Sequence, residues 1–284
     1  MRNLIDAIDT IVRGGNHLVG DETTSTNRLN SDGEALEDYI KDVFADSLGV
    51  TPQERLLKRS AEFSYLGNQS NPPDAMIRGG EAIEIKKLES VSPDLALNSS
   101  YPKDKLYSTS TSISAACRNC EEWESKDMIY AVGVVNSRDK SLKSLCFVYG
   151  EDYCADKSVY EGLRTRLKEG IKQIEGIDFA ETQELGRINK VDPLGITYLR
   201  CRNMWHIKNP MALFRDFYSF GDNASFTLVA IINDERLRLL GNEAVLRELE
   251  KDFPNFEIKD ISIPDPNNPA NIKSAKIITY YESN

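Results

Sequence analysis

Residues 72–88 read PPDAMIRGGEAIEIKKL, and the fold can be worked outward from this stretch. Two short segments, 74–78 and 81–88, flank a pair of glycines, which is the pattern of two β-strands joined by a tight turn. In the second segment Glu84 and Lys86 alternate with two isoleucines, so the charged pair shares one face of the strand and the isoleucines share the other. The stretch therefore predicts a hairpin with one apolar and one charged face.

The charged face predicts a metal-dependent hydrolytic site. Asp74 and Glu84 supply the hard oxygen ligands that Mg²⁺ prefers, and Lys86 places an ammonium group beside them. A metal ion at such a site lowers the pKa of a water molecule and offsets the negative charge that grows on a phosphodiester. We therefore expect Asp74 and Glu84 to be metal ligands and all three residues to be catalytic.

The length of the turn decides whether the two acids meet. Directly opposed residues of a hairpin share a face, so Asp74 lies opposite Glu84 if the turn has an odd number of residues, such as 78–80. A two-residue turn at Gly79-Gly80 would instead pair Asp74 with Ile85 and put the acids on opposite faces. The prediction requires a turn of three or five residues, or a bulge.

The acid-x-Lys tripeptide is weak by itself, because about three copies are expected by chance in a chain of this composition. Three occur, at Glu84, Glu124 and Glu257, and only Glu84 follows a proline-aspartate pair and a glycine turn. The alternative is an ordinary exposed hairpin with Asp74 in a turn. Glu37, on the helix predicted before the hairpin, is a further candidate catalytic acid, and its alternative is a solvated helix residue.

Hydrophobic periodicity predicts an α/β fold in one domain over 1–284, with a loop-rich C-terminal elaboration at about 252–284. The predicted helices are 2–13, 33–49, 53–63, 114–124, 157–175 and 234–251. The predicted strands are 74–78, 81–88, 128–136, 142–149 (with 128–136, a hairpin), 196–207, 226–232 and 276–281. The segment 89–111 is expected to be a polar loop.

Composition narrows the class of protein. The chain has 284 residues, a net charge of −10 and no apolar run near the length that crosses a bilayer, so we expect a cytoplasmic protein without a membrane partner. The five cysteines suit a reducing compartment. Cys117 and Cys120 form a lone CxxC, and a zinc site would need two further ligands. No P-loop, GxGxxG or GxSxG occurs, so we expect neither a nucleotide cofactor nor a hydrolase triad.

Two segments carry residues suited to DNA. In the polar loop the predicted contacts to phosphate and base edges are Asn98, Ser99, Ser100, Tyr101 and Lys103. On the predicted strand 196–207 they are Arg200, Arg202, Trp205 and His206. Arginine bound to guanine through two hydrogen bonds is the commonest specific major-groove contact. The alternatives are a polar surface loop and an edge strand with solvated arginines. The basic helix 157–175 could follow the DNA backbone or be a solvated face.

The sequence resembles type II restriction endonucleases of the PD-(D/E)xK superfamily, and most closely the NgoPII family, whose members cut duplex DNA at GGCC. The segments that carry the resemblance are NRLNSDGEALEDYIKDVF (27–44), FSYLGNQSNPPDAMIRGGEAIEIKKLES (63–90), LNSSYPKDKL (97–106), CRNCEEWESKDMIYAVG (117–133) and LRCRNMWHIKNP (199–210).

The resemblance implies a restriction-endonuclease-like mixed β-sheet flanked by α-helices. It also implies Mg²⁺-dependent cleavage of double-stranded DNA at a short palindrome by a homodimer, as part of a restriction-modification system. Asp74 and Glu84 would then bind the metal, Lys86 would orient or activate the attacking water, and Glu37 would be an accessory acid. The alternatives are a DNA-binding module on an inactive nuclease scaffold and a structure-specific repair nuclease.

Overall fold

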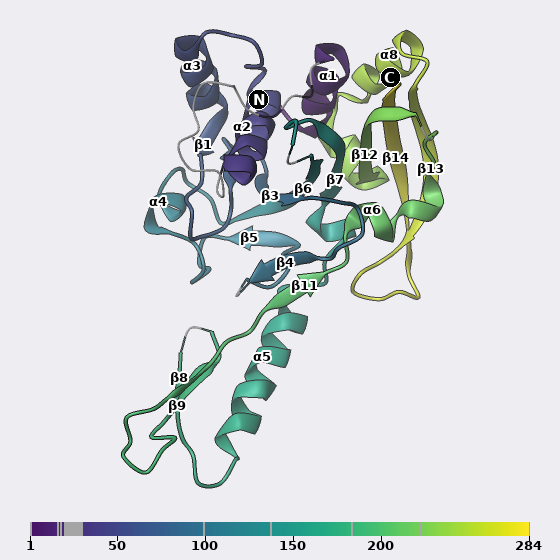
Figure 1. Cartoon of the computed structure of the whole chain (residues 1–284). Helices are drawn as coiled ribbons and strands as arrows, with labels where there is room; N and C mark the ends of the chain where they lie inside the picture. The colour runs from purple at the N-terminus through teal and green to yellow at the C-terminus, as the bar shows by residue number, and fades with distance from the viewer. Residues whose placement is uncertain are drawn as a thin grey trace.

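The computed structural model describes residues 2–15, 17, 19, 31–98, 100–136, 138–182, 184–221 and 223–283, and only the backbone of residues 31 and 32. In this part of the chain nine strands form one sheet, of which eight follow the order β1-β2-β3-β6-β7-β12-β14-β13 and the ninth, β5, pairs with β6 (Figure 1). Their bounds are β1 Phe63–Tyr65, β2 Ala75–Ile77, β3 Ala82–Leu88, β5 Lys105–Tyr107, β6 Ser125–Val135, β7 Leu142–Tyr149, β12 Ala224–Asn233, β13 Phe256–Pro264 and β14 Ile272–Ser283. The β3–β6 and β7–β12 pairs are parallel and the others antiparallel, which confirms the predicted mixed sheet.

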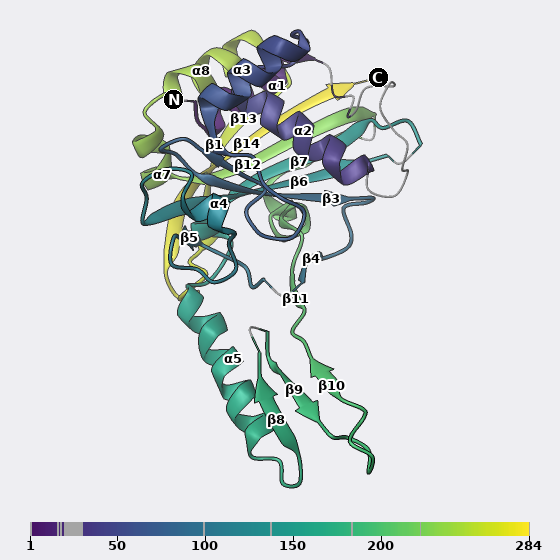
Figure 2. The ribbon, with the colours of Figure 1, turned by 90° about the vertical axis from the view of Figure 1, so that its left-hand side faces the viewer.

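Helices cover one face of this sheet, and Figure 2 shows α1, α2, α3 and α8 together on that side. Their bounds, with that of α7, are α1 Leu4–Gly14, α2 Ser31–Ala45, α3 Pro52–Glu62, α7 Asp234–Leu240 and α8 Glu243–Asp252. The apolar stripe of α2 packs on Ile83 and Ile85 of β3 in a buried core, as the alternation in β3 predicts. The same alternation turns Glu84 and Lys86 toward the opposite face.

That opposite face has a second apolar core, covered by smaller elements. They are α4 Ala115–Arg118, α6 Pro210–Leu213, the 3₁₀ turns Gly150–Asp152 and Arg215–Phe217, and the ribbon of β4 Leu95–Asn98 with β11 Trp205–Ile207. Two strands, β4 and β5, thus lie within the predicted polar loop 89–111, and that prediction was wrong for them. The reason is that each pairs with a strand remote in sequence.

A long helix and a small sheet project from the rest of the molecule (Figures 1 and 2). We call residues 157–204 the arm and the rest of the chain the body. The elements of the arm are α5 Lys157–Lys172 and the antiparallel strands β8 Asp178–Glu181, β9 Gly186–Asn189 and β10 Leu199–Cys201. The single nuclease domain over 1–284 stays a prediction.

Most predicted helices and strands are confirmed, including α5 and the β6–β7 hairpin. The helix expected at 234–251 is two helices, because Gly241 adopts a left-handed φ of 76° and ends the first. The strand expected at 196–207 is two strands, since β10 pairs within the arm and β11 pairs with β4. The helix expected at 114–124 ends at Arg118.

The C-terminal segment, expected to be rich in loops, consists mainly of the strands β13 and β14, which pair along their length. Its prolines stand at strand ends and in the connection, where no ladder hydrogen bond is lost. No helix in the described part of the chain is long and apolar enough to cross a membrane.

Candidate active site

The β2–β3 hairpin brings the two predicted metal ligands close together. Its register pairs Ala75 with Ile83 and Met76 with Ala82, and the Asp74 amide donates to the Ile83 carbonyl at 3.0 Å, so Asp74 stays bound to β3 at the end of β2. The charge of Glu84 acts on Asp74, as expected of neighbouring side chains. The Ile77 amide likewise donates to the Glu81 carbonyl at 2.9 Å, which leaves 78–80 as a three-residue turn. The predicted odd-numbered turn is therefore confirmed.

The three side chains form one half-buried charged group. Lys86 Nζ lies 2.6 Å from Glu84 Oε1, and Asp74 Oδ2 accepts a hydrogen bond of 2.6 Å from the Ile85 amide. Burial, followed by the negative charge of Glu84, raises the pKa of Asp74 to about 7. Burial alone would lower the pKa of Lys86, but the charges of Glu84 and Asp74 outweigh it and raise that pKa to about 12. With both carboxylates ionised beside a single ammonium group, this half-buried group carries a net negative charge.

These carboxylates fit a divalent cation. Glu84 Oε2 is buried and has no hydrogen-bond partner, which is costly unless another group binds it. No cluster of three His, Cys, Asp or Glu side chains with metal-binding geometry occurs among the described residues. A pair is nevertheless sufficient for Mg²⁺, which keeps several waters and is commonly held by one or two carboxylates together with substrate phosphates. Cys117 and Cys120 likewise have no further His, Cys, Asp or Glu placed to complete a zinc site among the described residues.

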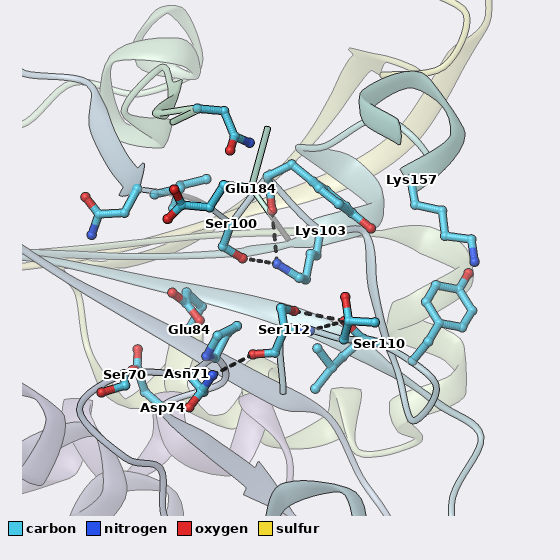
Figure 3. Close-up of a pocket in the computed structure, with 18 of the residues that line it drawn as sticks. Ser70, Asn71, Asp74, Glu84, Ser100, Lys103, Ser110, Ser112, Lys157 and Glu184 are labelled. Carbon is cyan, nitrogen blue, oxygen red and sulfur yellow. Dashed lines mark hydrogen bonds between the residues drawn. The ribbon is translucent and has the colours of Figure 1, made fainter. Parts of the chain in front are cut away.

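The same group lies in a cleft of about 510 Å³, whose lining includes Asp74, Glu84 and Lys86. Figure 3 shows Asp74 on one side of this cleft and Ser100 with Lys103 on the other. Four of the residues predicted to bind DNA line it, namely Asn98, Ser100, Tyr101 and Lys103. Ser99, the fifth residue of that loop in the prediction, lies outside the described residues.

Lys103 is fixed across the cleft by the central sheet. Tyr130 of β6 lies beside Glu84 in the parallel register, and its hydroxyl accepts from the Lys103 amide at 2.7 Å and donates to the Lys103 carbonyl at 3.2 Å. Lys103 Nζ donates to Ser100 Oγ and, at 3.1 Å, to the Tyr101 carbonyl. Burial lowers the pKa of Lys103 to about 8, although the negative charge of Glu84 opposes that effect. The cleft thus carries a second buried amine that faces the carboxylates.

The predicted arginines lie at the rim of the arm and not in the lining of the cleft. Arg202 donates to both carboxylate oxygens of Glu184 at 2.9–3.1 Å, and Arg200 lies 3.6 Å from the same group. Glu184 itself lines the cleft (Figure 3). Arg200 and Arg202 do share one side of the arm, as predicted, but through a common carboxylate.

Trp205, His206 and Glu37 are also absent from the lining. Trp205 packs against Tyr160 at a ring distance of 5.5 Å, where the arm leaves the body, and His206 is exposed. Glu37 belongs to α2, on the other face of the sheet, and lies 3.2 Å from Lys41. Its charge is the weakest of the causes that raise the pKa of Asp74. The structure therefore does not bring these three residues into the cleft.

Several lining residues were missed by the sequence analysis. They come from two polar loops, at Asn68–Pro72 and at Ser110 and Ser112. Lys157 and Arg164, which also line the cleft, belong to the basic helix that the sequence offered as a possible contact to the DNA backbone. Asn71 Nδ2 donates to the Ser112 carbonyl at 3.0 Å, so the two loops are joined beside Asp74. The one available signal was the position of the first loop immediately before Pro73-Asp74.

Comparisons with known proteins agree with this geometry. The profile described as NgoPII restriction endonuclease matches residues 2–264. The protein called type II restriction enzyme NgoPII, from Neisseria gonorrhoeae, is 48% identical over 281 residues, which cover 98% of this chain and 99% of that protein. No solved structure matches the chain. Because both matches span nearly the whole sequence, the chain belongs to the NgoPII restriction endonuclease family.

Proposed function

We propose that this protein is a type II restriction endonuclease that hydrolyses both strands of duplex DNA at a short palindromic site, GGCC being the site that the resemblance implies. The observation that carries the proposal is the half-buried group of Asp74, Glu84 and Lys86 in a cleft, with one buried glutamate oxygen left without a partner. Membership of the family supports the enzyme class. The cofactor we propose is Mg²⁺, held by Asp74 and Glu84.

The roles of the residues follow from their charges. When bound, Mg²⁺ would lower the pKa of water and offset the charge that develops on the phosphate. Lys86 remains protonated beside two carboxylates, so it donates hydrogen bonds to orient the attacking water and does not remove its proton. Lys103 lies across the cleft, where its ammonium group suits a phosphate oxygen. Attack in line with the bond to the 3′ oxygen leaves 5′-phosphate and 3′-hydroxyl ends.

We assign DNA recognition to the side of the arm that adjoins the cleft through Glu184. Arg200 and Arg202 each present a guanidinium that is more than half exposed, and Glu184 holds both, which limits their rotamers before DNA binds. We expect Arg202→Ala to lose cleavage at the specific site with weaker binding.

A palindrome and a cut in each strand also call for two copies of the chain. The free cysteines of the described part of the chain suit the cytoplasm.

The test is to incubate the purified protein with unmethylated plasmid DNA in Mg²⁺ and, in parallel, in EDTA, and to separate the products on a gel. Discrete bands that require Mg²⁺ and map to one short palindrome support the proposal. A smear, or cutting only at junctions and flaps, would indicate a nuclease without sequence specificity. Binding without cutting would indicate a DNA-binding module.

A further inference from the structure

The loop that joins β9 to β10 carries the most exposed apolar side chains of the described part of the chain. We call residues 191–198 the tip. Leu194 is 81% exposed and Ile196 is 77% exposed, the two highest values among the large hydrophobic residues described. Val191 and Tyr198 are 56% and 59% exposed. Single exposed apolar residues are ordinary, but four within eight consecutive residues mark a surface that contacts another molecule.

Hydrogen bonds hold the tip in one conformation. The carboxylate of Asp192 accepts from the Leu194 amide at 2.9 Å and from the Thr197 amide at 2.5 Å. The Asp192 carbonyl accepts from the Gly195 amide at 2.9 Å, and Gly195 adopts a left-handed φ of 68°, which closes the loop. An ordered backbone thus presents the apolar side chains to solvent, so binding them to another molecule costs little further backbone entropy.

The two strands that lead to the tip share a cationic face. We call residues 186–202 the ribbon. Its register pairs Arg187 of β9 with Arg200 of β10, so their side chains share one face, and Arg202 follows two residues later on that face. Arg187 also lies over the ring of Tyr198 at 5.2 Å, which links this face to the tip. Like charges directly opposed destabilise a sheet, so this face is suited to bind an anion.

Charge and position indicate that the anion is DNA. The ribbon carries four Lys and Arg against one acid, Asp192, whose two carboxylate oxygens already bind amides of the tip. The whole chain, in contrast, has a net charge of −10. Glu184, which contacts both Arg200 and Arg202, lines the cleft (Figure 3). The cationic face is therefore continuous with the place where DNA is cut, whereas an acidic protein partner has no such link to the cleft.

We propose that the ribbon binds DNA outside the recognised site, with its arginines on the phosphates and with Leu194 and Ile196 inserted into the minor groove as an apolar wedge. The inference rests on the proposed function, which places DNA in the cleft. Apolar side chains that enter the minor groove unstack a base step and bend the duplex.

The length of the ribbon sets where the wedge meets DNA. The ladder continues past β10 to the tip, because the Val191 amide donates to the Thr197 carbonyl at 3.0 Å. Thr197 lies five residues before Arg202. At about 3.3 Å for each residue of a strand, the tip is roughly 16 Å farther from the cleft than Arg202. DNA advances about 3.4 Å for each base pair, so the wedge reaches a step about five base pairs away, outside GGCC.

The first test measures DNA binding of the full-length protein by fluorescence anisotropy in EDTA. Leu194→Ser/Ile196→Ser removes the wedge. The matched control Leu239→Ser/Ile272→Ser changes one leucine and one isoleucine of the body, 71% and 63% exposed. On a duplex of about 30 base pairs we expect the tip variant to bind at least tenfold more weakly than wild type, with or without a central GGCC, and the control to bind within twofold of wild type. A centred GGCC duplex of about 10 base pairs, too short to reach the tip, should bind all three proteins equally.

The second test locates the wedge with 2-aminopurine, a base whose fluorescence rises when it is unstacked. With the probe at successive flanking positions of the longer duplex, wild type should raise the fluorescence at least twofold at one of them, and the tip variant should not. Arg187→Gln should reduce the salt slope of binding to this duplex by about one. These two measurements keep the proposal testable even if the tip variant does not fold.

Three results would overturn the proposal: a folded tip variant that binds the longer duplex as wild type does, an equal loss in the control, or no rise in fluorescence at any flanking position. In the first case, a lower mass of the tip variant in sedimentation would identify the tip as a protein contact instead. Plasmid cutting separates this proposal from the proposed function. A protein that does not cut in Mg²⁺ but loses DNA binding with the tip would contradict the nuclease and leave the ribbon contact standing. Discrete cutting together with an unaffected tip variant would do the reverse.

Discussion

Lys86 and Lys87 are adjacent lysines on β3 with different surroundings. Lys86 turns to the cleft and contacts Glu84, whereas Lys87, by the alternation of the strand, turns to the other face, where Glu89 is 3.8 Å away. Loss of an ammonium group that acts on the transition state lowers rates by about 100- to 1,000-fold. We expect that loss for Lys86→Ala and less than a threefold change for Lys87→Ala, measured as the initial rate of plasmid cutting. An active Lys86→Ala protein would contradict the assignment.

The charge of Asp74 is costly to the folded protein in the absence of metal. Its pKa is about 7 in the folded protein, above its ordinary value, because of burial and the charge of Glu84. The folded protein therefore binds more protons than the unfolded chain between about pH 4 and pH 7, and its stability falls as the pH rises through that range.

Asp74→Asn removes this charge and keeps an oxygen that can accept from the Ile85 amide. In EDTA at pH 8 we expect the variant to be more stable than wild type by on the order of 2–4 kcal/mol, and by less at pH 5. Urea unfolding at the two pH values measures the difference, and cutting in Mg²⁺ should be lost. Equal stability of the two proteins at pH 8 would show that the ionised Asp74 carboxylate does not destabilise the folded protein.

At the scale of elements, the turn of the β2–β3 hairpin sets the geometry of the site. Gly79 has a φ of 67°, and its amide donates to Glu121 at 2.8 Å. A side chain in this left-handed region costs about 1–2 kcal/mol. Gly79→Ala should lower the free energy of unfolding by that amount in urea titrations. Gly80, which has no positive φ, is the matched control, and Gly80→Ala should change stability by less than half as much.

Helices α7 and α8 and strands β10 and β11 show how elements depend on their neighbours. Residues 234–251 have one helical period, but Gly241 in the left-handed region divides them. Residues 196–207 alternate as one strand, but Arg202–Met204 connect two strands that pair with different partners. Local pattern predicted the type of structure in both places. A left-handed glycine divides the helix, and pairing with two different partners divides the strand.

At the scale of the whole molecule, an acidic protein presents a locally basic cleft. Five Lys and Arg and four Asp and Glu line the cleft, and two of those acids are the proposed metal ligands. Five basic residues then face only two other acids, so the cleft attracts DNA phosphates although the whole chain has a net charge of −10. Assuming about four phosphate contacts, DNA affinity should fall roughly 100-fold between 50 and 200 mM KCl.

Lys157 is an exposed lysine of this lining at the junction of arm and body, 4.5 Å from the ring of Tyr107. Replacing it with glutamine should weaken binding about equally for all DNA sequences and reduce the salt slope by about one. Fluorescence anisotropy with a specific and a random duplex measures both effects. Lys143→Gln, an exposed change outside the cleft lining, is the control and should leave the slope unchanged. A loss confined to the specific duplex would instead make Lys157 a base contact.

The sequence alone predicted the α/β fold and the group proposed to be catalytic, because Asp74, Glu84 and Lys86 lie within 13 residues of one hairpin and strand alternation sets which side chains share a face. The sequence left open whether the hairpin turn has an odd or an even number of residues, and the structure shows that it has three. Tertiary structure alone placed Lys103, Asn71 and Glu184 around that group, since each depends on contacts between segments far apart in the chain. It also separated the arm from the body. Periodicity predicts that α5 has an apolar face, but only the packing of the whole chain leaves that face uncovered.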